Sequence, residues 1–266
     1  MKMDGGSKRK LSKRKDPVLS LAFYRQEGYH PFAVKVYMLT LLNSDFEEWH
    51  AKFPDKPLEE FPFRIGKMSR SGALFDLDKL NDISRNELSR LTVQEMEAFL
   101  KEWALAFGSE AQQAYFADEA YLAEVLALCM GVGGKKRRKD FVTAKQAMEE
   151  IGYFFSDYAR RDAYRVNDET RNAVLDGFLA TYSAENDAQV WFSKVKELAA
   201  SLGYAAEMRD YKADPAAYRG NVSDVAEVLR IAVTGRANSP DLWTIMHILG
   251  EERTRARILA ARVQTD

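Results

Sequence analysis

The sequence has very few of the residues that build disulfides and zinc sites. Its single cysteine, Cys129, excludes a disulfide framework and any metal site made of several cysteines. None of its three histidines has another histidine or a cysteine at the spacing of a zinc site. The chain lacks a run of about 18 apolar residues that could span a bilayer, and no apolar signal segment follows its first lysines. These absences predict a cytosolic protein that is not attached to a membrane.

The short motifs of common enzyme folds are also missing. There is no G-x-x-x-x-G-K-[ST] phosphate loop and no G-x-S-x-G nucleophile motif. Gly131-Val132-Gly133-Gly134 is rich in glycine but follows a helical pattern, whereas a dinucleotide-binding turn follows a strand. We interpret it as a flexible joint that presents the basic residues 135–139. No complete catalytic constellation is found.

The composition is that of a folded globular protein, with 30% charged and 46% hydrophobic residues. The net charge of -1 argues against a protein that is basic throughout, but it is compatible with a basic face on an acidic body. Most apolar residues recur with helical period, and hardly any stretch alternates apolar and polar residues. We therefore predict an all-α fold.

Proline and glycine mark the first two predicted helices. Asp16-Pro17 and His30-Pro31 place proline at the first turn, where its missing N–H is tolerated. Gly28 ends the first helix, so the two helices form a hairpin. Further helices are predicted over residues 75–91, from 92, and over 117–130, 143–155, 168–181, 187–202, 224–233, 239–249 and from 251. Residues 45–65, rich in aromatics and proline, are expected to be irregular but packed.

Capping residues support several of these helices. Thr92 and Glu95 match a capping box, and Asp76 and Ser84 are candidate N-caps. Ser239-Pro240 predicts an N-cap followed by proline at the first helical position. On the apolar runs that contain them, Cys129 and His247 are both interpreted as buried structural residues.

A basic loop, Lys10-Leu11-Ser12-Lys13-Arg14, follows a glycine-led segment near the start of the chain. On composition alone, such a short charged run is typical of a solvated tail. The loop nevertheless resembles the second signature of the class I aminoacyl-tRNA synthetases, in the form found in glutamyl-tRNA synthetases. Residues 24–42 then resemble the helical hairpin of that family, and residues 72–81 resemble its stem-contact segment. Residues 229–236, 239–242 and 249–253 resemble its last anticodon-binding segment.

These four blocks occur in the order of bacterial-type glutamyl-tRNA synthetases and correspond to their C-terminal half, from the basic loop onward. A second run, Lys67-Met68-Ser69-Arg70-Ser71, is closer to the general class I signature. The stem-contact segment follows it at once, so no catalytic half could precede it in the family order. We interpret this run as a structural or tRNA-facing loop.

The resemblance implies three regions: a loop and stem-contact region at 1–92, and helical anticodon-binding subdomains at 93–184 and 185–266. It implies that the parent enzyme, a glutamate-tRNA ligase, uses ATP with Mg²⁺. Lys13 and Lys10 would then hold the ATP phosphates, with Leu11, Ser12 and Arg14 completing the loop. The family's catalytic domain precedes this loop and is missing here, so we expect this chain to bind no cofactor and to be inactive alone.

The implied partner is tRNA for glutamate, with tRNA for glutamine left open, and a monomer is expected. By the motif match, Arg230 reads a base, and Ser239, Pro240 and Leu242 form a wall beside it. Within residues 135–139, Arg138 or Arg137 would contact the anticodon or a phosphate; a solvated basic loop is the alternative. A stand-alone RNA-binding module and a helical protein-interaction scaffold also remain open. Phosphate contacts would make affinity fall with salt, which separates RNA binding from the scaffold.

Overall fold

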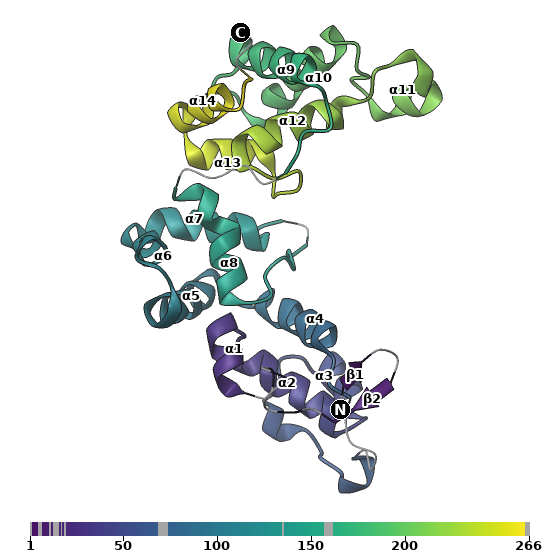
Figure 1. The fold of residues 1–266 in the computed structure, drawn as a ribbon, viewed down its shortest axis with the longest axis vertical. Helices are drawn as coiled ribbons and strands as arrows, with labels where there is room; N and C mark the ends of the chain where they lie inside the picture. The colour runs from purple at the N-terminus through teal and green to yellow at the C-terminus, as the bar shows by residue number, and fades with distance from the viewer. Residues whose placement is uncertain are drawn as a thin grey trace. The chain divides into compact units, whose positions relative to one another are not determined.

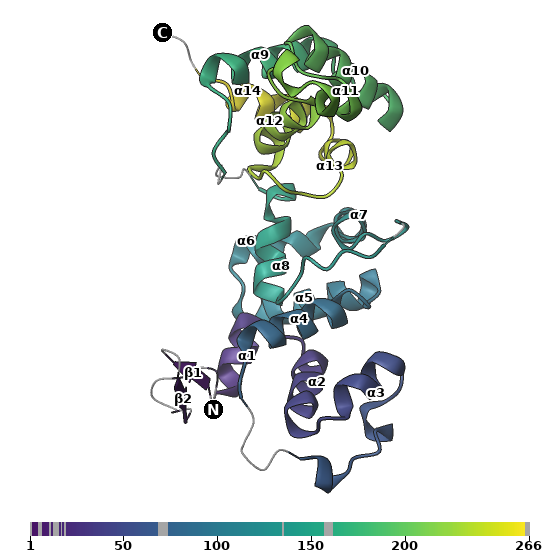
Figure 2. The same ribbon diagram turned by 90° about the vertical axis from the view of Figure 1, so that its right-hand side faces the viewer.

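The structure is a computed structural model that describes residues 2–4, 7–10, 12, 16, 18, 20–68, 74–134, 136–156 and 162–263. Helices dominate these residues (Figures 1 and 2), which confirms the predicted all-α class. Among them the only strands are β1 (Lys2–Asp4) and β2 (Ser7–Arg9), an antiparallel pair. No helix in the described ranges is long and apolar enough to cross a membrane.

The chain divides into two compact units, Met1–Ile151 and Gly152–Asp266. The three regions predicted from the resemblance, with boundaries at 92/93 and 184/185, stay a prediction. Unit 1 contains α1 (Leu21–Glu27), α2 (Pro31–Leu42), α3 (Phe46–Lys52), α4 (Leu77–Leu88), α5 (Val93–Phe107), α6 (Glu110–Gln113), α7 (Glu119–Met130) and α8 (Ala144–Ile151), with short 3-10 turns η2 (Leu58–Glu60), η3 (Ile65–Lys67) and η4 (Ala114–Ala117).

The predicted hairpin of α1 and α2 turns at Gly28, which has a left-handed φ of 77°. A side chain there would be strained and would also collide, because an added Cβ would lie 2.7 Å from Ala144 Cβ and 2.8 Å from Trp103 Cδ1. The Gly28 carbonyl accepts a bond from Ala144 N at 2.7 Å, and Trp103 Nε1 donates to the Gln26 carbonyl at 3.0 Å. Gly28 is therefore the point at which α1, α5 and α8 pack together.

The core of unit 1 includes two aromatic-rich clusters on α2 and its neighbours. One contains Tyr24, Tyr29, Tyr37 and Leu80, and the other contains Val36, Phe46 and Phe61. The Tyr29 hydroxyl donates to Asn81 Oδ1 at 2.6 Å, and burial is the main cause that raises the pKa of Tyr29 to about 12. The tyrosines thus bury their rings and keep their hydroxyl groups hydrogen-bonded.

The predicted start of the second helix at His30-Pro31, the predicted N-cap Asp76 and the capping box of Thr92 and Glu95 are confirmed. Ser84 is not a cap. It lies inside α4, fully buried, and its hydroxyl donates to the Val142 carbonyl at 2.5 Å. The Ser84 hydroxyl is therefore bonded to a distant carbonyl, and it does not accept a bond from a backbone N–H at the start of a helix.

Two other predictions for unit 1 need correction. The first helix begins at Leu21 with Ser20 as its N-cap, and not at Asp16-Pro17; Pro17 lies outside the described residues. Residues 46–52, expected to be irregular, form α3. The Phe46 and His50 side chains lie one helical turn apart and are both buried, and acidic residues occupy the first turn, where they favour helix formation.

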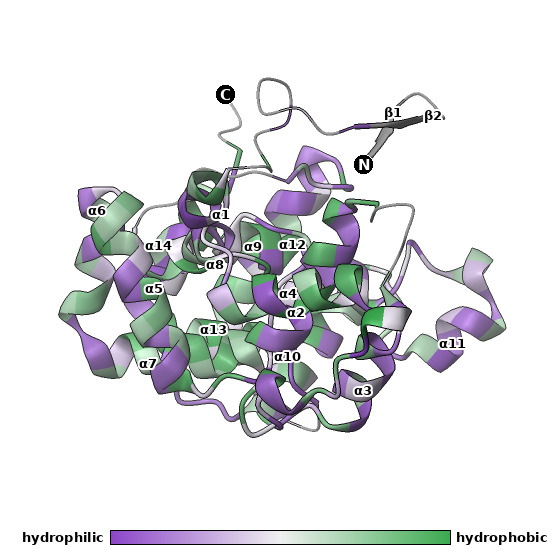
Figure 3. Ribbon diagram, turned by 90° about the horizontal axis from the view of Figure 1, so that it is seen from below, coloured by the Kyte–Doolittle hydropathy of each residue, from purple (hydrophilic) through white to green (hydrophobic). Residues whose placement is uncertain are grey.

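Unit 2 is organised around α12 (Val222–Thr234), which packs against α9 (Asp168–Thr181), α10 (Ala188–Ser201) and α14 (Glu251–Ala260). It also contains α11 (Met208–Ala213), α13 (Leu242–Leu249), and the 3-10 turns η5 (Gly152–Phe154) and η6 (Pro215–Ala217). Helix α12 ends at Gly235, whose left-handed φ of 75° confirms the predicted break. Figure 3 shows α13 as predominantly hydrophobic.

The start of α13 and the burial of His247 were predicted wrongly. The helix begins at Leu242, with Asp241 as the N-cap that accepts from Thr244 N at 2.8 Å, so Ser239 and Pro240 precede it. His247 is exposed, and its ring stacks on Trp243 at 5.3 Å between centroids. Cys129, by contrast, is buried as predicted.

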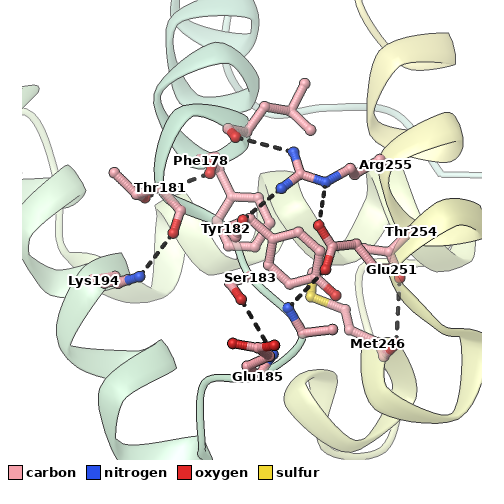
Figure 4. Close-up of polar contacts among 12 residues, drawn as sticks. Phe178, Thr181, Tyr182, Ser183, Glu185, Lys194, Met246, Glu251, Thr254 and Arg255 are labelled. Carbon is pink, nitrogen blue, oxygen red and sulfur yellow. Dashed lines mark hydrogen bonds and ion pairs between the residues drawn. The ribbon is translucent and has the colours of Figure 1, made fainter.

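Arg255 joins α14 to the end of α9 (Figure 4). Its guanidinium donates to the carbonyls of Leu179 at 3.2 Å and Tyr182 at 2.6 Å, and to Glu251 Oε1 at 2.7 Å. Glu251 in turn accepts a bond from Ala184 N at 3.2 Å, and the bond from Arg255 is the main cause that lowers its pKa. One arginine thus satisfies carbonyls that the end of a helix leaves unpaired.

We predict that Arg255→Ala lowers the free energy of unfolding of unit 2 by about 1–3 kcal/mol, because these carbonyls lose a charged donor. Hydrogen exchange of peptides from α9 and α12 measures this free energy. Arg262→Ala is the matched control, since Arg262 pairs with the exposed Asp176 and should contribute less than about 1 kcal/mol. Equal losses in both variants would contradict the capping role.

A second prediction concerns His30, whose Nδ1 accepts a bond from Phe32 N at 3.3 Å and whose ring lies 4.8 Å from that of Phe99. Burial lowers the pKa of His30 and outweighs the opposing effect of nearby glutamates. The unfolded chain therefore takes up the proton first, so stability of unit 1 should fall as pH decreases through the ordinary histidine value near 6.5.

The measurement is hydrogen exchange of α2 peptides at pH 7.5 and 5.5, corrected for the intrinsic pH dependence of exchange. We expect lower protection at pH 5.5 in the native chain. His30→Asn keeps an N-cap acceptor without a titrating group and should lose much of this pH dependence. The same decrease in His30→Asn would show that another group is responsible.

Candidate nucleic-acid interface

Arg230 on α12 holds the loop that leads into α13. One of its terminal nitrogens donates to the Ser239 hydroxyl, to the Ser239 carbonyl at 3.3 Å and to the Pro240 carbonyl at 2.7 Å. All three residues are half-buried. The structure therefore brings together three of the four residues that the sequence singled out in this region, which we call the Arg230 loop (Arg230, Ser239 and Pro240).

The turn after α12 brings the Arg230 loop into place. Thr234 Oγ1 donates to the Arg230 carbonyl at 2.8 Å and accepts a bond from Arg236 N at 3.2 Å. Asp162 Oδ2 accepts a bond from Ala237 N at 2.6 Å. Together these bonds hold the turn after α12, and Ser239 returns to the helix face that carries Arg230.

Leu242, the fourth predicted residue, is only 2% exposed. It belongs to the buried side of α13. Its side chain is therefore not available as a surface wall in this structure, because core packing encloses it.

The basic run at 135–139 lies on unit 1 and folds back on it. Arg138 pairs with Asp140 through two nitrogens at 2.5 and 2.6 Å. Arg137 donates to the Leu91 carbonyl at 2.9 Å, and Lys139 donates to Asn86 Oδ1 at 2.6 Å. Among the described residues, the second terminal nitrogen of Arg137 is buried with no hydrogen-bond partner. The run is therefore partly engaged within unit 1 and is not simply a solvated loop; Lys135 lies outside the described residues.

The loop predicted to hold ATP phosphates falls largely outside the described residues, which omit Leu11, Lys13 and Arg14. Lys10 is exposed. Ser12 N donates to Asp16 Oδ2 at 2.7 Å, and Asp16 N donates back to the Ser12 carbonyl at 2.8 Å. These two bonds join Ser12 to Asp16, and the phosphate-binding role of the loop stays a prediction.

The second run that resembles the class I signature is held on the body of unit 1. Lys67 pairs with Asp45 at 3.3 Å, and its carbonyl accepts a bond from Ser44 N at 3.3 Å. Met68 forms a bridge with Asn43. These contacts favour the structural interpretation of Lys67 and Met68, while residues 69–71 lie outside the described part.

Two cavities were not predicted. One, of about 460 Å³ in unit 1, contains His50, whose Nε2 lies 2.9 Å from Glu87 Oε1. The other, of about 230 Å³ in unit 2, is lined by three tyrosines. In the part of the chain that the structure describes, no group of three or more His, Cys, Asp or Glu side chains could hold a metal ion. The linings of both cavities come from distant segments, so no sequence spacing marks them.

Comparisons with known proteins agree with the position of the Arg230 loop. A family described as an anticodon binding domain matches residues 219–262. The chain is 47% identical over 261 residues to a glutamate–tRNA ligase of Acetivibrio thermocellus, covering 97% of this chain and 47% of that protein. It is 40% identical over 267 residues to a glutamate–tRNA ligase of Clostridium perfringens strain 13, covering 97% of this chain and 48% of the relative.

The fold is shared with a solved structure. The crystal structure of a glutamate tRNA ligase from Elizabethkingia meningosepticum, in complex with its amino acid, matches with a TM-score of 0.62 and 17% sequence identity. The match covers 98% of this chain and 49% of that chain. At this identity the likeness shows the fold alone. The chain spans about half the length of the curated relatives it matches.

Proposed function

Because this chain is homologous to the glutamate–tRNA ligases over nearly its whole length, we propose that it is the tRNA-binding portion of such an enzyme. The Arg230 loop would contact the anticodon. The observation that carries this proposal is the anticodon-binding match at 219–262, which contains Arg230 and the residues that it holds. A synthetase of this kind activates glutamate with ATP and joins it to the 3′ end of its tRNA.

The Arg230 loop suits single-stranded RNA. Proteins read RNA sequence mainly in unpaired loops, where bases are splayed out and expose their edges. A guanidinium offers a planar fork of donors that suits a base edge or a phosphate. Here one nitrogen of that fork already holds Ser239 and Pro240, so the half-buried Arg230 shapes the loop. Arg138 or Arg137 on unit 1 would contact the anticodon or a phosphate.

In the parent enzyme, Lys13 and Lys10 would bind the ATP phosphates. ATP with Mg²⁺ supplies the group that activates glutamate, and fixed positive charge from the two lysines would stabilise the transition state. This requires a catalytic domain, which the resemblance places before the basic loop. The remaining proposals are a cytoplasmic monomer and tRNA for glutamate as substrate, with tRNA for glutamine undecided.

A stand-alone RNA-binding module derived from a synthetase is the second candidate. The observation that favours it is that each of the two units is compact by itself. Both candidates require tRNA affinity in this chain, and they differ in whether a catalytic partner domain is needed for function.

We predict that Arg230→Ala weakens tRNA binding by about 1–3 kcal/mol, because a base contact and the loop geometry are both lost. Filter binding at several salt concentrations measures the affinity. For the unaltered chain, log affinity should fall linearly with log salt, since phosphate contacts release counterions. Arg262→Ala, which removes an exposed arginine of the same unit, should leave the affinity nearly unchanged.

If Arg230→Ala binds tRNA as tightly as the unaltered chain, Arg230 is not a tRNA contact. If the unaltered chain shows no salt-dependent affinity for tRNA at all, the proposed function is wrong and the scaffold alternative is favoured.

We also predict that this chain alone does not catalyse glutamate-dependent pyrophosphate exchange with ATP and Mg²⁺. The described residues are mainly helical, and the basic loop would lack the opposing wall of a nucleotide-binding domain. The full-length ligase of Acetivibrio thermocellus is the positive control. Exchange above background that disappears in Lys13→Ala would contradict the prediction.

A further inference from the structure

The unpredicted cavity of unit 2 lies beside α12 and has a volume of about 230 Å³. Its walls combine aromatic rings with charges of both signs. We call it the tyrosine pocket and define it by Tyr164, Tyr204, Tyr211, Arg165, Arg219 and Glu227.

Two of its three aromatic walls are held rigidly. Tyr204 is 6% exposed and packs against Gly220, where an added Cβ would lie 3.0 Å from the Tyr204 ring. The Tyr164 ring is covered by the guanidinium of Arg171 at 4.7 Å, and Arg171 is itself buried and paired with Asp168 at 3.0 Å. A site with such preformed walls loses little freedom when a ligand enters.

The third wall and the charges lie nearer the surface. Tyr211 is a half-buried residue of the short helix α11. Glu227, with its side chain 22% exposed, pairs with Arg165 at 3.4 Å, and the Arg165 side chain is 80% exposed. An ion pair with so exposed a partner contributes little to the stability of the fold. Arg165 can therefore leave Glu227 and bind a ligand at a small cost in free energy. Arg219 is exposed as well and donates to Thr170 Oγ1 at 3.3 Å.

This combination of groups suits a nucleotide. Tyrosine rings stack on unpaired bases, guanidinium groups bind phosphate oxygens, and a carboxylate accepts bonds from the amino group of a base such as cytosine. A purely apolar ligand would form no hydrogen bond or ion pair with the two arginines or with Glu227.

The pocket also lies next to the Arg230 loop. Glu227 and Arg230 are three residues apart on α12, and residues at this spacing are neighbours on a helix surface. One strand of RNA could therefore place one base at the Arg230 loop and an adjacent base in the pocket.

We propose that the tyrosine pocket binds a second unstacked nucleotide of the same RNA loop and prefers a base that carries an amino group over uracil. This inference rests on the proposed tRNA-binding function. Tyr211 would stack on the base, Glu227 would accept from its amino group, and Arg165 and Arg219 would contact its phosphates.

The test measures binding of four probes to the full chain at low salt: tRNA, the single-stranded RNA hexamers C6 and U6, and the mononucleotide CMP. In the unaltered chain we expect C6 to bind at least about fivefold more tightly than U6, as one base contact provides. Tyr211→Ala should weaken C6 binding at least about fivefold through lost stacking. Tyr218→Ala is the matched control, because Tyr218 lies in the same segment but does not line the pocket.

Glu227→Gln is a second, gentler variant. A carboxylate only accepts hydrogen bonds, whereas an amide both donates and accepts. The substitution should therefore remove most of the preference for C6 over U6. Unfolding temperatures of all variants report whether they fold. The proposal is overturned if C6 and U6 bind equally to the unaltered chain. It is also overturned if Tyr211→Ala and Tyr218→Ala have the same effect, or if Glu227→Gln keeps the preference.

CMP distinguishes RNA from a free nucleotide. If CMP binds as tightly as C6, the pocket takes a free nucleotide, and the proposed RNA contact is wrong. Normal tRNA binding that is insensitive to Tyr211→Ala and Glu227→Gln would overturn this inference and leave the proposed function intact. Absence of any tRNA binding by the unaltered chain would overturn both.

Discussion

Burial of α12 is the constraint on which the candidate interface of unit 2 depends. Eight residues of this helix are buried, and α9, α10 and α14 pack around it. The helix cannot rotate about its axis without exposing these apolar residues to water. The side of the helix that is not buried therefore has a fixed orientation. Arg230 and Glu227 lie on this side, so one packed helix positions both the Arg230 loop and the tyrosine pocket.

Arginine serves two different purposes in this unit. On α14, Arg255 and Arg257 are structural: Arg257 is 8% exposed and donates to the carbonyls of Val233 at 2.9 Å and Tyr153 at 2.5 Å. Removing such a buried charge from its partners is costly, so the Arg257 side chain is not available to RNA. Arg165 and Arg219 at the tyrosine pocket are exposed instead. The number of basic residues in a segment is therefore a poor measure of its RNA-binding surface.

Sequence reasoning succeeded where the decisive contact is local. The caps at Asp76 and Thr92, and the helix end at Gly235, each involve atoms within a few residues. It failed where a distant group competes. Ser84 bonds to the carbonyl of Val142, and Ser239 is held by Arg230 instead of capping α13. His247 was predicted to be buried from its apolar neighbours, but its side of α13 faces solvent.

The sequence by itself determined the helical class, most helix ends and the relationship to the synthetase family, because periodicity, capping and ordered motifs are all written in short stretches. It also singled out Arg230, Ser239 and Pro240. Only the tertiary structure decided that these three residues share hydrogen bonds, that Leu242 is enclosed by the core, and that Tyr164, Tyr204 and Tyr211 line one cavity. The physical reason is that burial and cavity shape depend on side chains that are far apart in the chain and are brought together only by packing.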